Sequence, residues 1–223
     1  MSDMSETTER LRAVDATIAK AAERAKRVAA DVELIAISKT RTADEIRPLL
    51  DSGHRLFGEN RVQEAASKWP VLRASYDKLA VHLVGQLQSN KAEDAVQLFD
   101  AIHSLDRISL VKTLAKAMDK HDRYIPCYLQ VNIGEEEQKG GCTIGDLPAL
   151  LESAQSAHIP VVGLMCVPPS QREPAPYFAL LAKLAKDHGL TGLSMGMSGD
   201  FETAIQLGAT HVRVGTALFG PRD

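Results

Sequence analysis

The feature that most constrains this sequence is a regular alternation of short apolar runs with longer amphipathic stretches. Eight runs fit buried strands, at 33–38, 55–58, 81–85, 99–103, 126–133, 161–166, 192–195 and 210–214. Helical stretches lie between them, at 42–52, 60–75, 89–97, 106–120, 145–156, 173–188 and 199–207, and a further helix precedes them at 5–29. Because parallel neighbours need crossover connections, this alternation predicts a parallel sheet.

Eight strands are also the number that closes a parallel sheet around its own side chains. We therefore expect an α/β fold with a single (β/α)8 TIM barrel, an extra N-terminal helix and one domain over residues 1–223, since no Gly-, Ser- or Pro-rich linker divides the chain. An open doubly wound sheet is the alternative. The first strand-to-helix turn reads SKTRT and lacks the glycine fingerprint of a dinucleotide site in such a sheet.

Local signals support several helix boundaries. In the first helix an apolar stripe with spacings of three and four consists of Leu11, Val14, Ile18, Ala21, Ala25 and Val28. Gly53 and Gly189 stand where helices are expected to end, because glycine readily takes the left-handed conformation found there. Ser89 and Asp106 stand before helical stretches, as N-terminal caps do.

Charge and cysteine content exclude several classes of protein. The formal net charge of −3 gives no general attraction to nucleic acid or to an anionic membrane. Three cysteines without CxxC spacing predict neither a disulfide framework nor a zinc site, and the seven histidines show no metal-ligand spacing, so we expect no metal. The polar start MSDMSETTER is not a secretory signal. We therefore expect a cytoplasmic protein. We also expect a monomer, because the sequence shows no long exposed apolar stripe that would form an obligate interface.

In a barrel of this kind, functional groups collect just after each strand. The residues at those places are Lys39, Glu59 with Asn60, Gln86, Ser104, Asn132, Met165, the turn from Gly196 to Gly199, and Gly215 with Thr216. By strand alternation Lys39 shares a face with Ile35 and Ile37. If that face lines the barrel, partial desolvation lowers the pKa of the amine and frees it for Schiff-base formation. The alternative is an exposed lysine at the start of a loop.

The segments MGMSGDFETA (195–204) and HVRVGTALFG (211–220) predict a phosphate site. Ser198 and Gly199 form a tight turn before a helix, and Gly215 with Thr216 forms another, so backbone N–H groups would face the mouth of the barrel. A phosphate held by the loops after strands seven and eight recurs in such barrels. Ser198 as a plain helix cap is the alternative. Arg213 lies inside the last strand, and alternation leaves open whether it faces the interior or solvent.

Several blocks together resemble the pyridoxal-phosphate homeostasis protein family: AISKTRTADEIRPLLDSGHRLFGENRVQEA, HLVGQLQSNK, HSLDR, QVNIGEEEQKGG, GLMCVPP, LSMGMSGDFETAIQLG and RVGTALFG. The resemblance runs from about residue 8 to the C-terminus. It implies a barrel like the N-terminal domain of alanine racemase, with pyridoxal 5′-phosphate bound to Lys39 as a Schiff base. It also implies that Ser198, Gly215 and Thr216 hold the phosphate, that Arg213 contacts the pyridine nitrogen, and that Asn60 lies near the cofactor.

An arginine at the pyridine nitrogen leaves that nitrogen unprotonated and makes the ring a weaker electron sink. Racemases of similar architecture bring a second domain and a tyrosine, and we expect neither here. The resemblance therefore implies a role in vitamin B6 homeostasis without conventional turnover, with apo-enzymes as possible recipients. Two alternatives stay open: a racemase-like enzyme, and a barrel that binds another phosphorylated metabolite without covalent chemistry.

Overall fold

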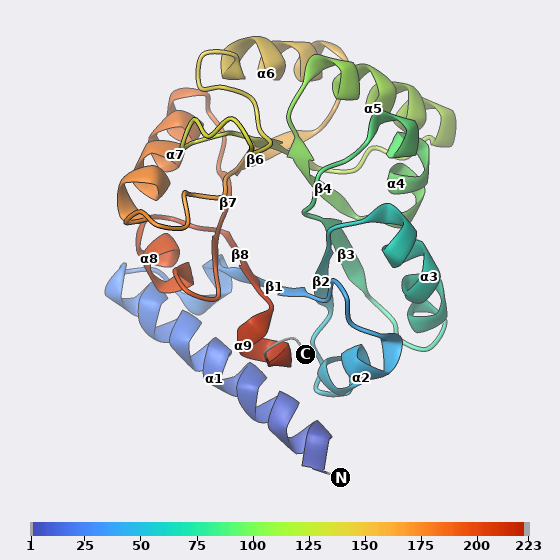
Figure 1. Cartoon of the computed structure of the whole chain (residues 1–223), viewed down its shortest axis with the longest axis vertical. Helices are drawn as coiled ribbons and strands as arrows, with labels where there is room; N and C mark the ends of the chain where they lie inside the picture. Colours follow the sequence, from blue (N-terminus) through green and yellow to red (C-terminus); the bar gives the residue numbers. More distant parts are fainter. Residues whose placement is uncertain (1, 221–223) are drawn as a thin grey trace.

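Eight short parallel strands close on themselves in the computed structural model, which describes residues 2–220 (Figure 1). The strands are β1 (Glu33–Ile37), β2 (Leu56–Glu59), β3 (Ala80–Leu83), β4 (Ala101–Leu105), β5 (Cys127–Gln130), β6 (Val161–Met165), β7 (Gly192–Met197) and β8 (His211–Val214). Each strand pairs with the next, and β8 returns to β1 with Ile35 opposite Arg213. The predicted (β/α)8 barrel is confirmed, and the open doubly wound sheet is excluded.

The helices surround the barrel (Figure 1). They are α1 (Ser2–Arg24), α2 (Ala43–Asp51), α3 (Val62–Arg73), α4 (Ala92–Leu98), α5 (Ile108–His121), α6 (Leu147–Ser156), α7 (Ala175–Asp187), α8 (Phe201–Gln206) and α9 (Thr216–Phe219), with 3-10 turns η1 (Ala29–Asp31) and η2 (Ser89–Lys91). Two predicted caps are wrong. Ser89 begins η2 rather than capping α4, and Asp106 pairs with Arg107 at 2.7 Å without capping α5.

Other boundary signals were read correctly. Gly53 and Gly189 follow α2 and α7 with φ of +92° and +68°, the left-handed conformation that ends a helix. The stripe on α1 is buried from Leu11 to Ala21, but Val28 is 63% exposed. The stripe stops early because the helix ends at Arg24 and Lys26 then turns with φ of +56°.

Alternation along β1 decides which side chains fill the barrel. Leu34 and Ala36 belong to the apolar core shared with the surrounding helices. Ile35 and Ile37 point inward, where they occupy the space that a side chain at Gly58 would need: a Cβ there would lie 2.7 and 2.6 Å from them. The face that Lys39 continues is therefore the interior face of the barrel.

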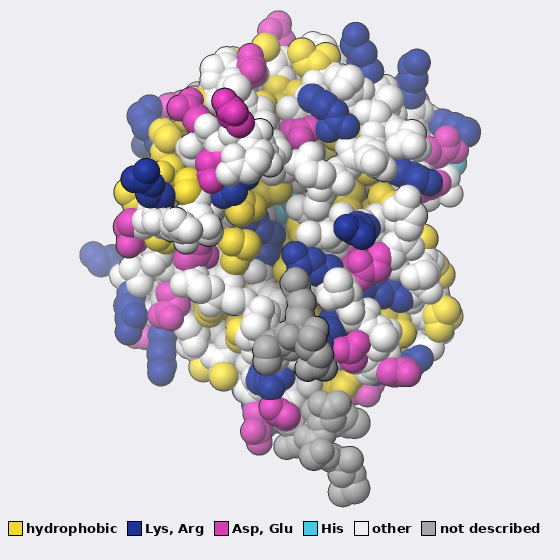
Figure 2. Space-filling model, viewed as in Figure 1, with side chains coloured by type: hydrophobic (Ala, Val, Ile, Leu, Met, Phe, Trp, Pro, Cys, Tyr) yellow, Lys and Arg dark blue, Asp and Glu magenta, His cyan; other side chains and the backbone are white. Residues whose placement is uncertain are grey.

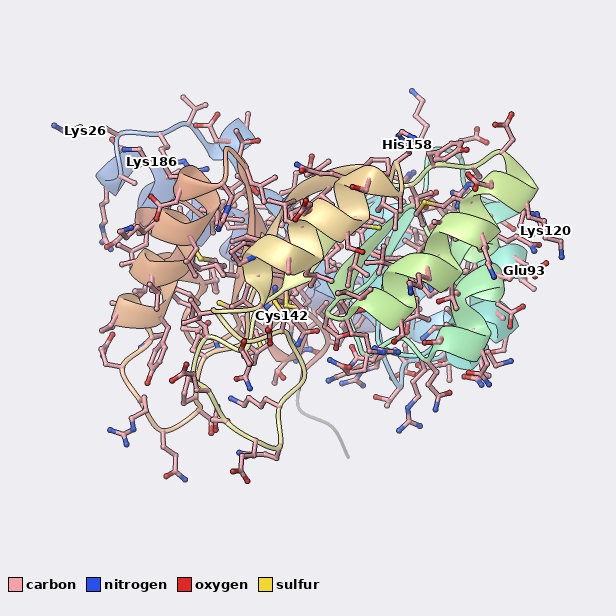
Figure 3. All side chains as sticks on the ribbon, turned by 90° about the horizontal axis from the view of Figure 1, so that it is seen from above. Lys26, Glu93, Lys120, Cys142, His158 and Lys186 are labelled. Atoms are coloured by element: carbon pink, nitrogen blue, oxygen red, sulfur yellow. The ribbon has the colours of Figure 1, made fainter. Side chains whose placement is uncertain are left out.

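The two ends of the barrel are clearly distinct (Figure 3). Cys142 lies among the loops that follow the strands, whereas Lys26, His158 and Lys186 lie at the opposite end, where the helices return to the strands. Within residues 2–220, no helix combines the length and apolar character needed to cross a bilayer. The same part of the chain contains no cluster of three or more metal-ligating side chains.

Candidate functional site

All six predicted site residues lie in or just after four strands that are consecutive neighbours around the barrel. Ser198 follows β7, Gly215 and Thr216 follow β8, Lys39 follows β1 and Asn60 follows β2, while Arg213 lies within β8. Carboxyl ends of parallel strands meet at one edge, so closure of the barrel brings these residues to the same sector of the mouth. Figure 2 shows dark-blue Lys and Arg side chains gathered near the centre of the face seen along the barrel axis. Such a gathering favours an anionic ligand.

Lys39 lies in the turn between β1 and α2 and is half-buried. This turn is held from behind by Lys68 of α3, whose ammonium donates to the carbonyls of Ser38 at 2.8 Å and Arg41 at 3.1 Å. The turn is held from the other side by α2, which begins with a capping box between Thr42 and Glu45. The backbone around Lys39 is therefore fixed by side chains on both flanks.

Glu59 was predicted to lie at the mouth of the barrel, and this prediction is wrong. Its side chain points outward, is completely buried, and accepts hydrogen bonds from Ser38 Oγ at 2.6 Å and Trp69 Nε1 at 3.1 Å. Lys68 Nζ lies 2.8 Å from the same carboxylate oxygen. Burial raises the pKa of Glu59, although Lys68 opposes the shift. Alternation reveals this direction, since Glu59 has the parity of Phe57, which packs against the helices.

The turns after β7 and β8 contact each other through Ser198. Its hydroxyl accepts a hydrogen bond from the backbone N–H of Gly215 at 3.3 Å, so it bridges the two turns rather than capping α8. Within residues 2–220, the backbone N–H groups of Ser198, Gly199 and Thr216 have no protein acceptor. Two helix starts and the Ser198 hydroxyl hydrogen thus offer several donors side by side, which is the arrangement that binds a phosphate.

The shape of the first of these turns depends on Gly196. Its φ is +93°, and a Cβ there would lie 2.6 Å from the Cβ of Ala204 and 2.9 Å from the Cα of Phe201. Asp200 completes the turn by accepting a hydrogen bond from the N–H of Met197 at 2.6 Å. Only glycine allows β7 to meet α8 this closely, and this contact places Ser198 and Gly199 at the mouth.

The structure resolves the direction of Arg213: its side chain points into the barrel and is 5% exposed. Nη1 donates to the carbonyl and hydroxyl oxygens of Ser194, both at 2.7 Å, and Nη2 donates to the carbonyl of Cys166 at 2.7 Å. Burial lowers the pKa of Arg213, yet an arginine stays charged under ordinary conditions. No carboxylate within the described residues pairs with this guanidinium, and its Nε–H and one Nη2–H have no acceptor there. This buried cation lies just past the end of β6 and has two spare donors. Such a group favours the binding of a polar ligand that accepts hydrogen bonds.

Asn60 borders a different part of the mouth. With Gly85, Gln86 and Lys91 it lines a cavity of about 570 Å³ beside the ends of β2 and β3. Ser198 lines a separate polar cavity of about 320 Å³ over the start of α8. The structure therefore brings Ser198, Gly215, Thr216 and Arg213 together around β7 and β8, with Lys39 on the adjoining strand, and places Asn60 one strand further along.

Sequence reasoning missed the polar groups that fill the barrel beneath this site. His103 of β4 is fully buried and contacts Ser194 of β7 at 2.8 Å and His82 of β3 at 3.1 Å. At the far end, His211 contacts Tyr128 at 3.2 Å and Glu33 at 3.2 Å. His82, His103 and His211 thus lie in strands, and each has a hydrogen-bond partner inside the barrel. Ser194 carried no signal, since a lone serine in a strand is unremarkable.

Comparison with known proteins places the chain in a family. Residues 10–223 match the family described as alanine racemase, N-terminal domain. The pyridoxal phosphate homeostasis protein of Pseudomonas aeruginosa is 41% identical over 226 residues, which cover 99% of this chain and 97% of that protein. The protein of the same name from Aquifex aeolicus is 40% identical over 96% of this chain. The chain belongs to the pyridoxal phosphate homeostasis protein family.

Solved structures agree with this family membership. PipY of Synechococcus elongatus, in a structure described as having pyridoxal phosphate bound, has a TM-score of 0.82 and 36% identity, and the match covers 96% of this chain and 100% of that one. An alanine racemase of Clostridium difficile matches with a TM-score of 0.71 but only 13% identity, over 57% of its length. That likeness shows a shared barrel fold and carries no functional argument.

Proposed function

We propose that this chain binds pyridoxal 5′-phosphate and serves vitamin B6 homeostasis, with residues 1–223 acting as one barrel domain. The observation that supports this proposal best is the buried guanidinium of Arg213 beside a ring of unpaired backbone donors. A ligand with a phosphate and a ring nitrogen accepts hydrogen bonds from both. The relatives in the same family carry the corresponding name, and PipY is described with this cofactor bound.

Each residue then has a distinct role. The Lys39 amine would hold the aldehyde of the cofactor as a Schiff base, and Lys68 and the capping box of α2 keep its turn in place. Ser198, Gly215 and Thr216 hold the phosphate at the two helix starts. Arg213 donates to the ring nitrogen. Asn60 contacts the cofactor from the next strand end.

The cofactor itself supplies an aldehyde that reacts with amines and a ring that withdraws electrons. Arg213 favours an unprotonated ring nitrogen, which weakens that withdrawal. The four tyrosines have other contacts: Tyr76 and Tyr124 donate to Asp51 and Asp119 on the surface, Tyr128 lies inside the barrel against His211, and Tyr177 of α7 packs against the apolar core. These features support storage or delivery of a reactive aldehyde over racemase-like turnover.

We further propose that the protein acts as a monomer in the cytoplasm and that apo-enzymes receive the cofactor. Free thiols at Cys127, Cys142 and Cys166 are consistent with a reducing compartment. Burial raises the pKa of each of these thiols to about 12, so none is a reactive thiolate at neutral pH.

The test is borohydride reduction of the full chain incubated with pyridoxal 5′-phosphate, followed by peptide mass spectrometry. An adduct confined to the Lys39 peptide supports the covalent site, and adducts scattered over surface lysines contradict it. The Lys39→Ala variant should lose the adduct. If this variant still binds the phosphate compound as tightly as the parent chain, a non-covalent metabolite barrel becomes the better description.

A further inference from the structure

The strands of the barrel carry a continuous row of hydrogen-bonded polar side chains that leads to Arg213. The row runs from His82 Nδ1 to His103 Nε2 at 3.1 Å, from His103 Nδ1 to Ser194 Oγ at 2.8 Å, and from Ser194 Oγ to Arg213 Nη1 at 2.7 Å. His103 lies on β4 and Ser194 on β7, three strands apart, so their contact crosses the barrel interior. The four side chains are at most 9% exposed.

The guanidinium fixes the direction of these hydrogen bonds because arginine can only donate. Ser194 Oγ accepts from Arg213, and the one acceptor left for its own hydrogen within the described residues is His103 Nδ1. His103 then carries its proton on Nε2 and donates to His82 Nδ1. Burial and the neighbouring charges lower the pKa of both histidines, His82 to about 4, which agrees with this neutral arrangement.

This row matters for Arg213 because the Ser194 hydroxyl is the one side-chain acceptor among its three acceptors in the described residues. The other two are the backbone carbonyls of Ser194 and Cys166. An arginine side chain loses considerable rotamer freedom when it is fixed, and the acceptors offset that loss. With Nη1 held by the hydroxyl and carbonyl of Ser194 and Nη2 by the carbonyl of Cys166, the plane of the guanidinium is fixed, and so is the direction of its two spare N–H bonds.

We propose that Ser194 and His103 are positioning residues for Arg213, and that through it they set the preference of this chain for a ring that contains a nitrogen acceptor. The proposal rests on the proposed function, because it takes the ligand of Arg213 to be the ring of pyridoxal 5′-phosphate. It extends that function by assigning specificity to two residues that do not themselves touch the ligand. Without the Ser194 hydroxyl, Arg213 keeps its charge and its two carbonyl acceptors, but it loses the side-chain acceptor that helps to align Nη1.

The test compares two ligands on the full chain: pyridoxal 5′-phosphate, and its analogue in which a C–H group replaces the ring nitrogen. The parent chain should bind the first about tenfold more tightly, the difference expected of one hydrogen bond to a charged group. Ser194→Ala should reduce this preference to about threefold or less, because part of that bond depends on alignment. Since the two ligands share every other contact, a general loss of stability cancels in the ratio.

Ser104→Ala is the matched control. Ser104 is another fully buried strand serine, next to His103 in β4, but its hydroxyl has no partner within the described residues. This variant should keep the preference of the parent chain. Should Ser194→Ala fail to fold, His103→Leu removes the acceptor of the Ser194 hydroxyl, together with the donor to His82, and should lower the preference. His103→Gln, which retains an acceptor, should keep it.

The outcomes separate the inference from the function on which it rests. An unchanged preference in folded Ser194→Ala or His103→Leu would overturn the positioning role. A parent chain that forms the Lys39 adduct yet shows no preference between the ligands would also overturn it, and would leave the cofactor site intact. A parent chain that binds neither ligand would refute the proposed function itself.

Discussion

Replacing Lys68 with methionine tests how the Lys39 turn is supported. Lys68 is 7% exposed in its side chain and Glu59 is completely buried, and their charged atoms lie 2.8 Å apart. Methionine has a similar length but no charge, so Lys68→Met leaves the Glu59 carboxylate buried without its cation. Breaking a buried ion pair on one side costs about 3–5 kcal/mol. For a chain of 223 residues, this corresponds to a melting temperature lower by about 6–20 °C.

The second substitution Glu59→Gln should recover most of the loss. A glutamine retains an oxygen that can accept from Ser38 and Trp69, and it has no charge to desolvate. The melting temperature of the double variant should therefore lie well above that of Lys68→Met alone. Lys183→Met is the matched control: Lys183 pairs with Asp187 on the surface, with side chains 69% and 48% exposed, and such a pair contributes less than about 1 kcal/mol.

The pH dependence of the stability of Lys68→Met tests the same buried-charge argument in a second way. The folded-state pKa of Glu59 is raised, so its contribution to stability is fully present below the unfolded pKa and is lost as the pH rises through the folded one. Without Lys68 that pKa rises further. The difference in stability between Lys68→Met and the parent chain should thus shrink as the pH is lowered from neutral toward the ordinary pKa of a glutamate. A constant difference, or a double variant no more stable than Lys68→Met, would refute the buried-charge argument.

Three further predictions concern the site and the barrel interior. Gly196→Ala should lower the melting temperature and weaken phosphate binding, because its Cβ would lie 2.6 Å from Ala204. Gly199→Ala in the same turn meets nothing within 4 Å and should be tolerated, and thermal melts of both variants test this. Ser198→Ala removes the acceptor of the Gly215 N–H and a phosphate donor, and should weaken binding of pyridoxal 5′-phosphate about tenfold in an equilibrium titration. His82 has a folded-state pKa of about 4 against an ordinary value of 6.5, so the stability that depends on its neutral form is complete above pH 6.5 and falls toward pH 4. The loss is on the order of 3 kcal/mol, and melts of the His82→Asn variant across that range should show a shallower decline.

Most of the fold could be predicted because strand and helix periods are local signals. The apolar runs marked all eight strands to within a few residues, and Gly53 and Gly189 marked two helix ends. The short helix α9 was not predicted, since four residues are too few to show a period. The caps at Ser89 and Asp106 failed because other local structure, η2 and an ion pair with Arg107, competes for the same residues.

The site was predictable only in part, for a reason that lies in the geometry of a barrel. The residues that follow a strand can be identified from that strand alone, so Lys39, Ser198 and Gly215 were within reach. The contact of His103 with Ser194 joins residues 91 positions apart on strands that are not neighbours. It depends on the stagger of the strands around the whole barrel, which no local pattern encodes.

Stability alone does not account for the polar interior of this barrel. The outward faces of the strands form a continuous apolar core with the helices, yet the inward faces carry two linked histidines, a serine and an arginine. Burying such groups is costly unless each finds a partner, and apolar side chains of similar volume would serve stability at least as well. The row ends at the guanidinium, which has two donors without an acceptor among residues 2–220. The interior is therefore better understood as support for a ligand-binding group than as core packing.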